Sequence, residues 1–204
     1  MRALVVCLLV CASACERNEA KGQGGSTSGS AVDDTAREQA RFDAERKPEK
    51  VVEALGIKPG SRVADVGAGS GLLTVHLARA VKPNGKVVAT DIDEEVLKLM
   101  YTRLQAAGLA EYVERRVVGS DTPGLELGAY DAILLAEVDH YFTEPVAWLK
   151  SAAASLKPGG RIVISNRIHH RNKSMAAAQK AGLKLASESA PVPTHFIAVF
   201  VVPD

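Results

Sequence analysis

Apolar and polar positions alternate along the chain in two different rhythms, which predict strands and helices in turn. Short apolar runs such as 62–66 suit buried strands, whereas apolar residues at helical spacing, as in 72–81, indicate amphipathic helices. The expected strands are 62–66, 86–92, 112–118, 130–138, 161–166, 183–189 and 195–202; the expected helices lie at 72–81, 93–109, 144–156 and 173–182, with helix-forming residues also at 35–57.

The order of these elements predicts the fold class. Strands that alternate with helices of this length are typical of a mostly parallel sheet with helices on both faces. The last two strands follow one another without a helix, so we expect them to form an antiparallel edge pair. Pro48 suits the start of a helix that ends near Gly56, and Asp93 suits an N-cap. The sequence therefore predicts a Rossmann-like α/β fold with seven strands, in which ligands bind at the carboxyl ends of the strands.

Composition narrows the class of protein. The chain has 25 Lys and Arg against 24 Asp and Glu, so it lacks the basic excess typical of nucleic-acid-binding domains. All three cysteines lie within the first fifteen residues. The rest of the chain therefore offers no disulfide, no cysteine nucleophile and no cysteine-based metal site. The adjacent His169 and His170 do not have the spacing of metal ligands on a helix. We therefore expect no metal and, from the charge balance, no nucleic-acid partner.

The N-terminus has the layout of a bacterial signal peptide. Arg2 precedes an apolar run at 3–10, and small residues lead to Cys15. The run is shorter than the about 20 apolar residues of a membrane span. The small residues before Cys15 resemble a lipoprotein signal, in which the cysteine is lipidated and becomes the new N-terminus. An ordinary cleaved signal and a mis-assigned start site are the alternatives.

This layout predicts a domain organisation and a location. We expect a signal peptide at 1–15, a flexible Gly/Ser-rich linker at 16–34 and a folded domain at 35–204. Lipidation of Cys15 predicts a protein anchored in the bacterial cell envelope. If the leader is not used, the expected location is cytoplasmic.

A glycine-rich turn follows the first predicted strand. Residues 62–74 read RVADVGAGSGLLT, with Gly67, Gly69 and Gly71 in the spacing G-x-G-x-G. A dinucleotide fingerprint has G-x-G-x-x-G, and a phosphate loop ends in Gly-Lys-Ser/Thr, which is missing here. The turn by itself only indicates close backbone packing or a ligand held against bare backbone.

Acidic and polar side chains at the ends of the strands narrow the choice of ligand. Asp65 lies within an apolar strand, where a carboxylate would repel a pyrophosphate and attract an ammonium group. Asp91 ends the second strand, where an acidic side chain can accept both ribose hydroxyls. Residues 119–121 follow the third strand, where polar groups can meet an adenine amino group. An ammonium, a ribose and an adenine without phosphate describe S-adenosylmethionine (AdoMet). The alternative is that Asp65 and Asp91 are loop or cap carboxylates.

Four segments resemble the successive motifs of class I AdoMet-dependent methyltransferases: VADVGAGSG, VVATDIDEEVL, YDAILLAEV and LKPGGRIVI. The resemblance covers roughly residues 41–202, and its lead-in is similar to that of small exported or anchored bacterial members. It implies AdoMet as the cofactor and a role for each of the following residues. Gly67, Gly69 and Gly71 admit the methionine part, Asp65 binds its amino group, Asp91 binds the ribose, Ser120 or Asp121 meets the adenine, and Glu137 lines the methyl-transfer end; Ala68 and Ile92 complete the predicted set.

Methyl transfer itself requires little from the protein beyond alignment of the acceptor with the methyl group. A base is needed only when the acceptor must lose a proton early. Asp139, His140 and Tyr141 follow the fourth strand and are the candidate catalytic residues, with His140 as a possible base. The alternative is that they cap and pack the next helix. The segment 167–173 is predicted either to bind an anionic acceptor or lipid headgroups, or to be a solvated loop.

The acceptor is restricted only by exclusion. The chain has no N-P-P-Y-type tetrad after the fourth strand, and beyond residue 15 it has no cysteine for attack on pyrimidines. Its loops are short, which favours a small molecule, a lipid or a protein surface as acceptor. AdoMet is made in the cytosol, whereas the leader indicates export. A second hypothesis is therefore an anchored nucleoside- or AdoMet-binding module without turnover. An aminopropyl transferase would need more acidic residues after the fourth strand.

Overall fold

The computed structural model describes residues 27–203, with side chains from residue 34 onward. The predicted signal peptide with Cys15, and residues 16–26 of the predicted linker, lie outside the described residues. The first helix, α1 (Thr27–Arg46), begins inside the segment predicted as linker, so residues 27–34 are helical rather than irregular. No helix within residues 27–203 is both long enough and apolar enough to span a bilayer.

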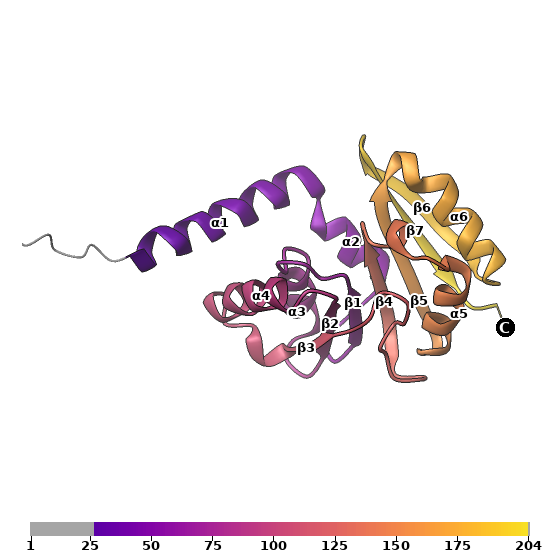
Figure 1. Cartoon of the computed structure of the whole chain (residues 1–204), viewed down its shortest axis with the longest axis horizontal. Helices are drawn as coiled ribbons and strands as arrows, with labels where there is room; N and C mark the ends of the chain where they lie inside the picture. The colour runs from indigo at the N-terminus through magenta and orange to yellow at the C-terminus, as the bar shows by residue number, and fades with distance from the viewer. Residues whose placement is uncertain (1–26, 204) are drawn as a thin grey trace, which may run out of the picture.

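A seven-stranded sheet forms the centre of the domain, in the order β3-β2-β1-β4-β5-β7-β6. Strands β1 to β5 run parallel to one another, and β7 runs antiparallel to both β5 and β6. This arrangement confirms the predicted Rossmann-like fold with an antiparallel edge pair (Figure 1). The strands are β1 (Arg62–Val66), β2 (Lys86–Asp91), β3 (Val113–Val117), β4 (Tyr130–Ala136), β5 (Leu156–Arg167), β6 (Lys184–Val192) and β7 (His195–Val201).

Helices cover both faces of the sheet, because successive strand residues point to opposite sides. Val63 and Val87 pack with α2, α3 and α4, whereas Ala64 and Val88 pack with α5 and α6. The helices beyond α1 are α2 (Pro48–Leu55), α3 (Thr74–Val81), α4 (Glu94–Ala106), α5 (Pro145–Ala154) and α6 (Arg171–Lys180), with short 3₁₀ turns η1 (Ala110–Tyr112), η2 (Asp139–Tyr141) and η3 (Ile168–His170).

Local signals explain where the helices begin and end. Pro48 opens α2, and Gly56 closes it with a left-handed φ of 61°. The Asp93 side chain accepts hydrogen bonds from the backbone N–H groups of Glu95 and Val96, as predicted for the N-cap of α4. β5 starts earlier than predicted, because Leu156 already pairs with Tyr130 before an irregularity in the ladder.

Candidate functional site

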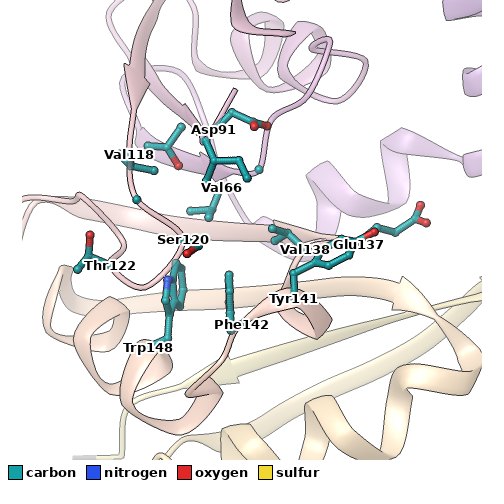
Figure 2. Close-up of a pocket in the computed structure, with 14 residues that line it drawn as sticks. Val66, Asp91, Val118, Ser120, Thr122, Glu137, Val138, Tyr141, Phe142 and Trp148 are labelled. Carbon is teal, nitrogen blue, oxygen red and sulfur yellow. The ribbon is translucent and has the colours of Figure 1, made fainter. Parts of the chain in front are cut away.

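Two adjoining cavities open at the carboxyl ends of β1, β2 and β4. The first has a volume of about 250 Å³ and the second about 160 Å³. Gly67 and Glu137 line both, so the two cavities meet at these residues. Figure 2 shows the first cavity, with Glu137 at one end and Thr122 and Trp148 at the other. This is the edge of the sheet at which the sequence predicted a ligand.

The glycine turn supplies bare backbone to both cavities. Gly67, Gly69 and Gly71 all have left-handed φ angles, of 67°, 55° and 84°. A Cβ on Gly67 would lie 2.6 Å from a Val138 methyl carbon, and one on Gly71 would lie 2.4 Å from Met100 Cγ. Gly67, Ala68 and Gly69 line the second cavity, whereas Gly71 is buried behind it.

Replacement of Gly71 by alanine is expected to destabilise the domain. The substitution combines a left-handed backbone with overlap against α4, and we expect a loss of about 2–4 kcal/mol in the free energy of unfolding. Gly119→Ala is the control, because Gly119 lines the first cavity but has open space around it and no left-handed φ. Urea denaturation measures both; equal stability of the two variants would contradict the packing described for Gly71.

Asp65 is a buried carboxylate at the second cavity. The Thr74 hydroxyl donates a hydrogen bond of 2.7 Å to its Oδ2. Burial raises the pKa of Asp65 to about 6, the Thr74 hydrogen bond opposes this rise, and the negative charge of Asp91 adds to it. A cation in the second cavity would favour the ionised form of Asp65.

Asp91 connects the end of β2 to the glycine turn. Its Oδ2 accepts a hydrogen bond of 2.9 Å from the Gly69 N–H group, and its Oδ1 accepts one of 3.1 Å from the Asp93 N–H group. Asp91 and the exposed Ile92 line the first cavity. Thr90, one residue earlier, also lines it, and its buried hydroxyl has no hydrogen-bond partner among the described residues. A ligand hydroxyl or ring nitrogen would satisfy this group.

The far end of the first cavity is polar on one side and aromatic on the other. Ser120 and Thr122 line it, whereas the exposed Asp121 does not, so of the two predicted adenine contacts only Ser120 faces the cavity. Phe142 and Trp148 stack with their ring centroids 4.1 Å apart. Thr122, Phe142 and Trp148 were not predicted as site residues (Figure 2).

Glu137 lies between three basic side chains. It is one of two non-glycine residues in the described chain with a left-handed φ, at 54°. Its carboxylate pairs with Arg46 of α1, with Arg167 at 3.1 Å and with His195 at 3.4 Å. Burial would raise the pKa of Glu137, but the positive charges of Arg46 and Arg167 outweigh it and hold this pKa below its usual value. Arg46 and His195 were not predicted, and Arg167 was predicted only as part of the segment 167–173 that could bind an anionic acceptor, not as a partner of Glu137.

The candidate catalytic residues are not equivalent in the structure. Asp139 is buried and accepts hydrogen bonds from Asn166 Nδ2, at 2.6 Å, and from the Ser174 hydroxyl. Those contacts tie η2 to β5 and α6, as expected for a packing residue. The His140 ring stacks on His170 with centroids 4.1 Å apart. Tyr141, which is 74% exposed, is the one of the three that lines the first cavity. Their catalytic roles stay predictions.

The basic segment 167–173 is partly neutralised. Arg167 pairs with Glu137, and Arg171 forms an ion pair with Glu188 of β6. Burial and the neighbouring charges of His140 and His169 lower the pKa of His170. Among the residues with described side chains, no group of three or more His, Cys, Asp or Glu has an arrangement that could hold a metal ion.

Comparison with known proteins identifies the family. Residues 64–162 match the family described as "Methyltransferase domain". The ubiquinone/menaquinone biosynthesis C-methyltransferase UbiE of Pseudomonas putida is 32% identical over 130 residues, which are 64% of this chain and 51% of the relative. The ubiquinone biosynthesis O-methyltransferase of Xanthomonas campestris pv. campestris is 31% identical over 146 residues, 71% of this chain and 58% of the relative.

A solved structure gives the same answer for the fold. The crystal structure of a SAM-dependent methyltransferase from Aquifex aeolicus superimposes with a TM-score of 0.73 at 22% identity, covering 84% of this chain and 98% of that one. The chain spans about half the length of the curated relatives it matches. It belongs to the class I AdoMet-dependent methyltransferases, which confirms the predicted family, fold and cofactor.

Proposed function

We propose that the chain transfers a methyl group from AdoMet to a small-molecule, lipid or protein acceptor. One observation carries this proposal: Asp65, the glycine turn and Asp91 line two cavities that meet at Glu137. A site of this kind suits a ligand with an ammonium group at one end and a nucleoside at the other. The family to which the chain belongs favours turnover over a binding module without catalysis.

Each part of the site has a proposed partner on AdoMet. Asp65 receives the amino group, and Arg46, which lines the same cavity, receives the carboxylate. Asp91 accepts hydrogen bonds from the ribose hydroxyls. Ser120 and Thr122 contact the adenine, which lies against the aromatic side of the first cavity.

Methyl transfer mainly requires that the acceptor atom and the methyl group of AdoMet are aligned. An acceptor atom with a free electron pair attacks the methyl carbon, the carbon–sulfur bond breaks, and neutral S-adenosylhomocysteine leaves. Glu137 is held as an ionised carboxylate where the two cavities meet, because Arg46 and Arg167 keep its pKa low. It is proposed to favour binding of the positively charged AdoMet rather than the transfer step itself.

The acceptor is proposed to approach over the carboxyl ends of β4 and β5. Tyr141, Arg167 and Ile168 are exposed there, with side chains that suit an apolar or anionic molecule. The two relatives are named for ubiquinone biosynthesis. A ring-hydroxylated quinone precursor is therefore the first acceptor class that we propose.

Methyl transfer is tested with AdoMet labelled in its methyl group. The full chain is incubated with 3,4-dihydroxybenzoate derivatives, a membrane lipid extract or a mixture of envelope proteins, and the label is followed into each. We expect label in the phenolic products. No transfer to any of the three classes, by a chain that binds AdoMet, would contradict the proposal and favour the binding module.

Lipidation of Cys15 and a location in the cell envelope remain proposals that rest on the sequence layout. They predict that the chain fractionates with membranes and that Cys15→Ser releases it. A wild-type chain found wholly in the cytosol would contradict both.

A further inference from the structure

The described side chains of helix α1, at residues 34–46, take no part in the hydrophobic core of the domain. The two core clusters begin at Val51 and contain none of them. A cavity of about 430 Å³ lies where α1 meets α3 and α4. Figure 1 shows α1 as a long helix whose N-terminal part projects away from the sheet. The position of α1 must therefore depend largely on polar contacts.

Arg103 of α4 makes a large share of those contacts. It is 7% exposed, and its guanidinium group reaches both the glycine turn and α1. Its Nε donates to the Ser70 carbonyl at 2.9 Å. Its Nη1 donates to the Thr35 carbonyl and to Gln39 Oε1, each at 3.3 Å, and its Nη2 pairs with Glu38. A planar guanidinium can serve several acceptors at once, which the ammonium group of lysine cannot do in the same geometry.

A second group of side chains reinforces the same attachment. Gln39 Nε2 donates to the Leu72 carbonyl at 3.1 Å and to Asp43 at 2.8 Å. His76 of α3 contacts Asp43 at 2.8 Å. The carbonyl groups of Ser70 and Leu72, on either side of Gly71, are thus both bonded to side chains that hold α1.

The attachment matters for one end of the site only. Phe42 and Arg46 of α1 line the second cavity, together with Asp65 and the glycine turn. Among the side chains of α1 that the structure describes, none lines the first cavity, where Asp91 and Ser120 lie. Displacement of α1 would therefore remove two lining residues from the second cavity and would leave the lining of the first cavity unchanged.

We propose that Arg103 is a positioning residue that fastens α1 over the amino-acid half of AdoMet. It acts through the Ser70 carbonyl on one side and through Glu38, Thr35 and Gln39 on the other. The proposal rests on the proposed function, because it assigns the second cavity to the methionine part. It makes Arg103 a determinant of affinity for that half of the ligand, although Arg103 lies outside both cavities.

The test compares two ligands on the full chain by calorimetric titration. S-adenosylhomocysteine carries the amino-acid half, whereas 5′-methylthioadenosine keeps adenine, ribose and sulfur but lacks the ammonium and carboxylate groups. For Arg103→Met we expect affinity for S-adenosylhomocysteine to fall about 10- to 100-fold, from the loss of charged hydrogen bonds. Affinity for 5′-methylthioadenosine should stay within about twofold, and Arg103→Lys should recover part of the loss.

Two further variants keep the test decisive. Glu38→Ala removes a half-exposed partner from α1, leaves the core intact, and should weaken S-adenosylhomocysteine about threefold with no effect on 5′-methylthioadenosine. Arg79→Met is the control, because exposed Arg79 lines the same 430 Å³ cavity from α3 and has no hydrogen bond to the turn within the described residues.

The outcomes separate the two claims. Equal weakening of both ligands by Arg103→Met would indicate a general structural role and overturn the inference, as would unchanged affinity for both. A wild-type chain that binds neither ligand would overturn the proposed function, and the role of Arg103 with it. Selective loss of S-adenosylhomocysteine in the Arg103 and Glu38 variants, with Arg79→Met unchanged, supports the assignment.

Discussion

Asp65→Asn is expected to remove measurable AdoMet binding at pH 7 and, at the same pH, to make the ligand-free domain more stable. The wild-type carboxylate is buried with a hydrogen bond from Thr74, and its pKa lies at about 6. At neutral pH it is therefore ionised at a cost of about 3 kcal/mol relative to its ordinary value near 3.8. Asparagine keeps the acceptor for Thr74 but cannot pair with an ammonium group.

The same pKa gives a pH dependence with a defined sign. Because the pKa of Asp65 is higher in the folded chain, the folded state binds more protons than the unfolded state between about pH 4 and pH 6. The contribution of Asp65 to stability is therefore favourable below pH 4 and is lost as the pH rises through 6. AdoMet affinity should rise over the upper part of this range, as Asp65 ionises.

Thermal unfolding and calorimetry of the wild type and Asp65→Asn from pH 4 to pH 8 check both statements. Asp139→Asn is the matched control, because Asp139 is also buried but lies against Asn166 and Ser174, away from the predicted cofactor. We expect that variant to be less stable and to keep its AdoMet affinity. An Asp65→Asn variant that binds AdoMet as tightly as the wild type would remove Asp65 from the site.

Asp91→Ala is expected to weaken AdoMet by about 3 kcal/mol, or roughly a hundredfold. The substitution removes the predicted acceptor for both ribose hydroxyls. It also frees the Gly69 N–H group, whose 2.9 Å hydrogen bond to Asp91 fixes the glycine turn. Affinity should thus fall for every ligand that contains the ribose, including 5′-methylthioadenosine.

Asp93→Ala is the control for Asp91. Asp93 lies two residues away and caps α4 through the N–H groups of Glu95 and Val96. Its loss should cost about 1 kcal/mol of stability and leave AdoMet affinity intact. If the two variants lost affinity equally, the loss would reflect damage to α4 rather than the ribose contact.

The sequence was sufficient to predict the sheet and to identify the polar residues at the ends of its strands as candidate site residues. Buried strands such as β1 and β4 show as short apolar runs, and an Asp inside such a run stands out because burial of a charge is costly. Asp65 was predicted for that reason, Asp91 from its place at the end of the second strand, and Glu137 from the family resemblance alone. The start of α1 could not, because Gly and Ser precede Asp33 and Asp34, and helix formers begin only afterwards.

The rest of the site depends on contacts between distant parts of the chain. Arg46 and His195 lie far from Glu137 in sequence and meet it only when α1 and β7 are in place. The burial of Asp139 likewise follows from its contacts with Asn166 and Ser174, which its position after β4 does not reveal. Ser120 faces the first cavity and Asp121 does not. Which of two adjacent residues in an irregular loop faces a cavity cannot be read from the sequence.

The assignment of the two cavities to AdoMet can be tested by calorimetric titration of AdoMet and S-adenosylhomocysteine into the full chain. We expect micromolar binding of both ligands to one site, with the affinity strongly reduced in Asp91→Ala and retained in Asp93→Ala. Absence of binding by the folded wild-type chain, for both ligands and at both pH 6 and pH 8, would contradict the assignment of the two cavities to AdoMet.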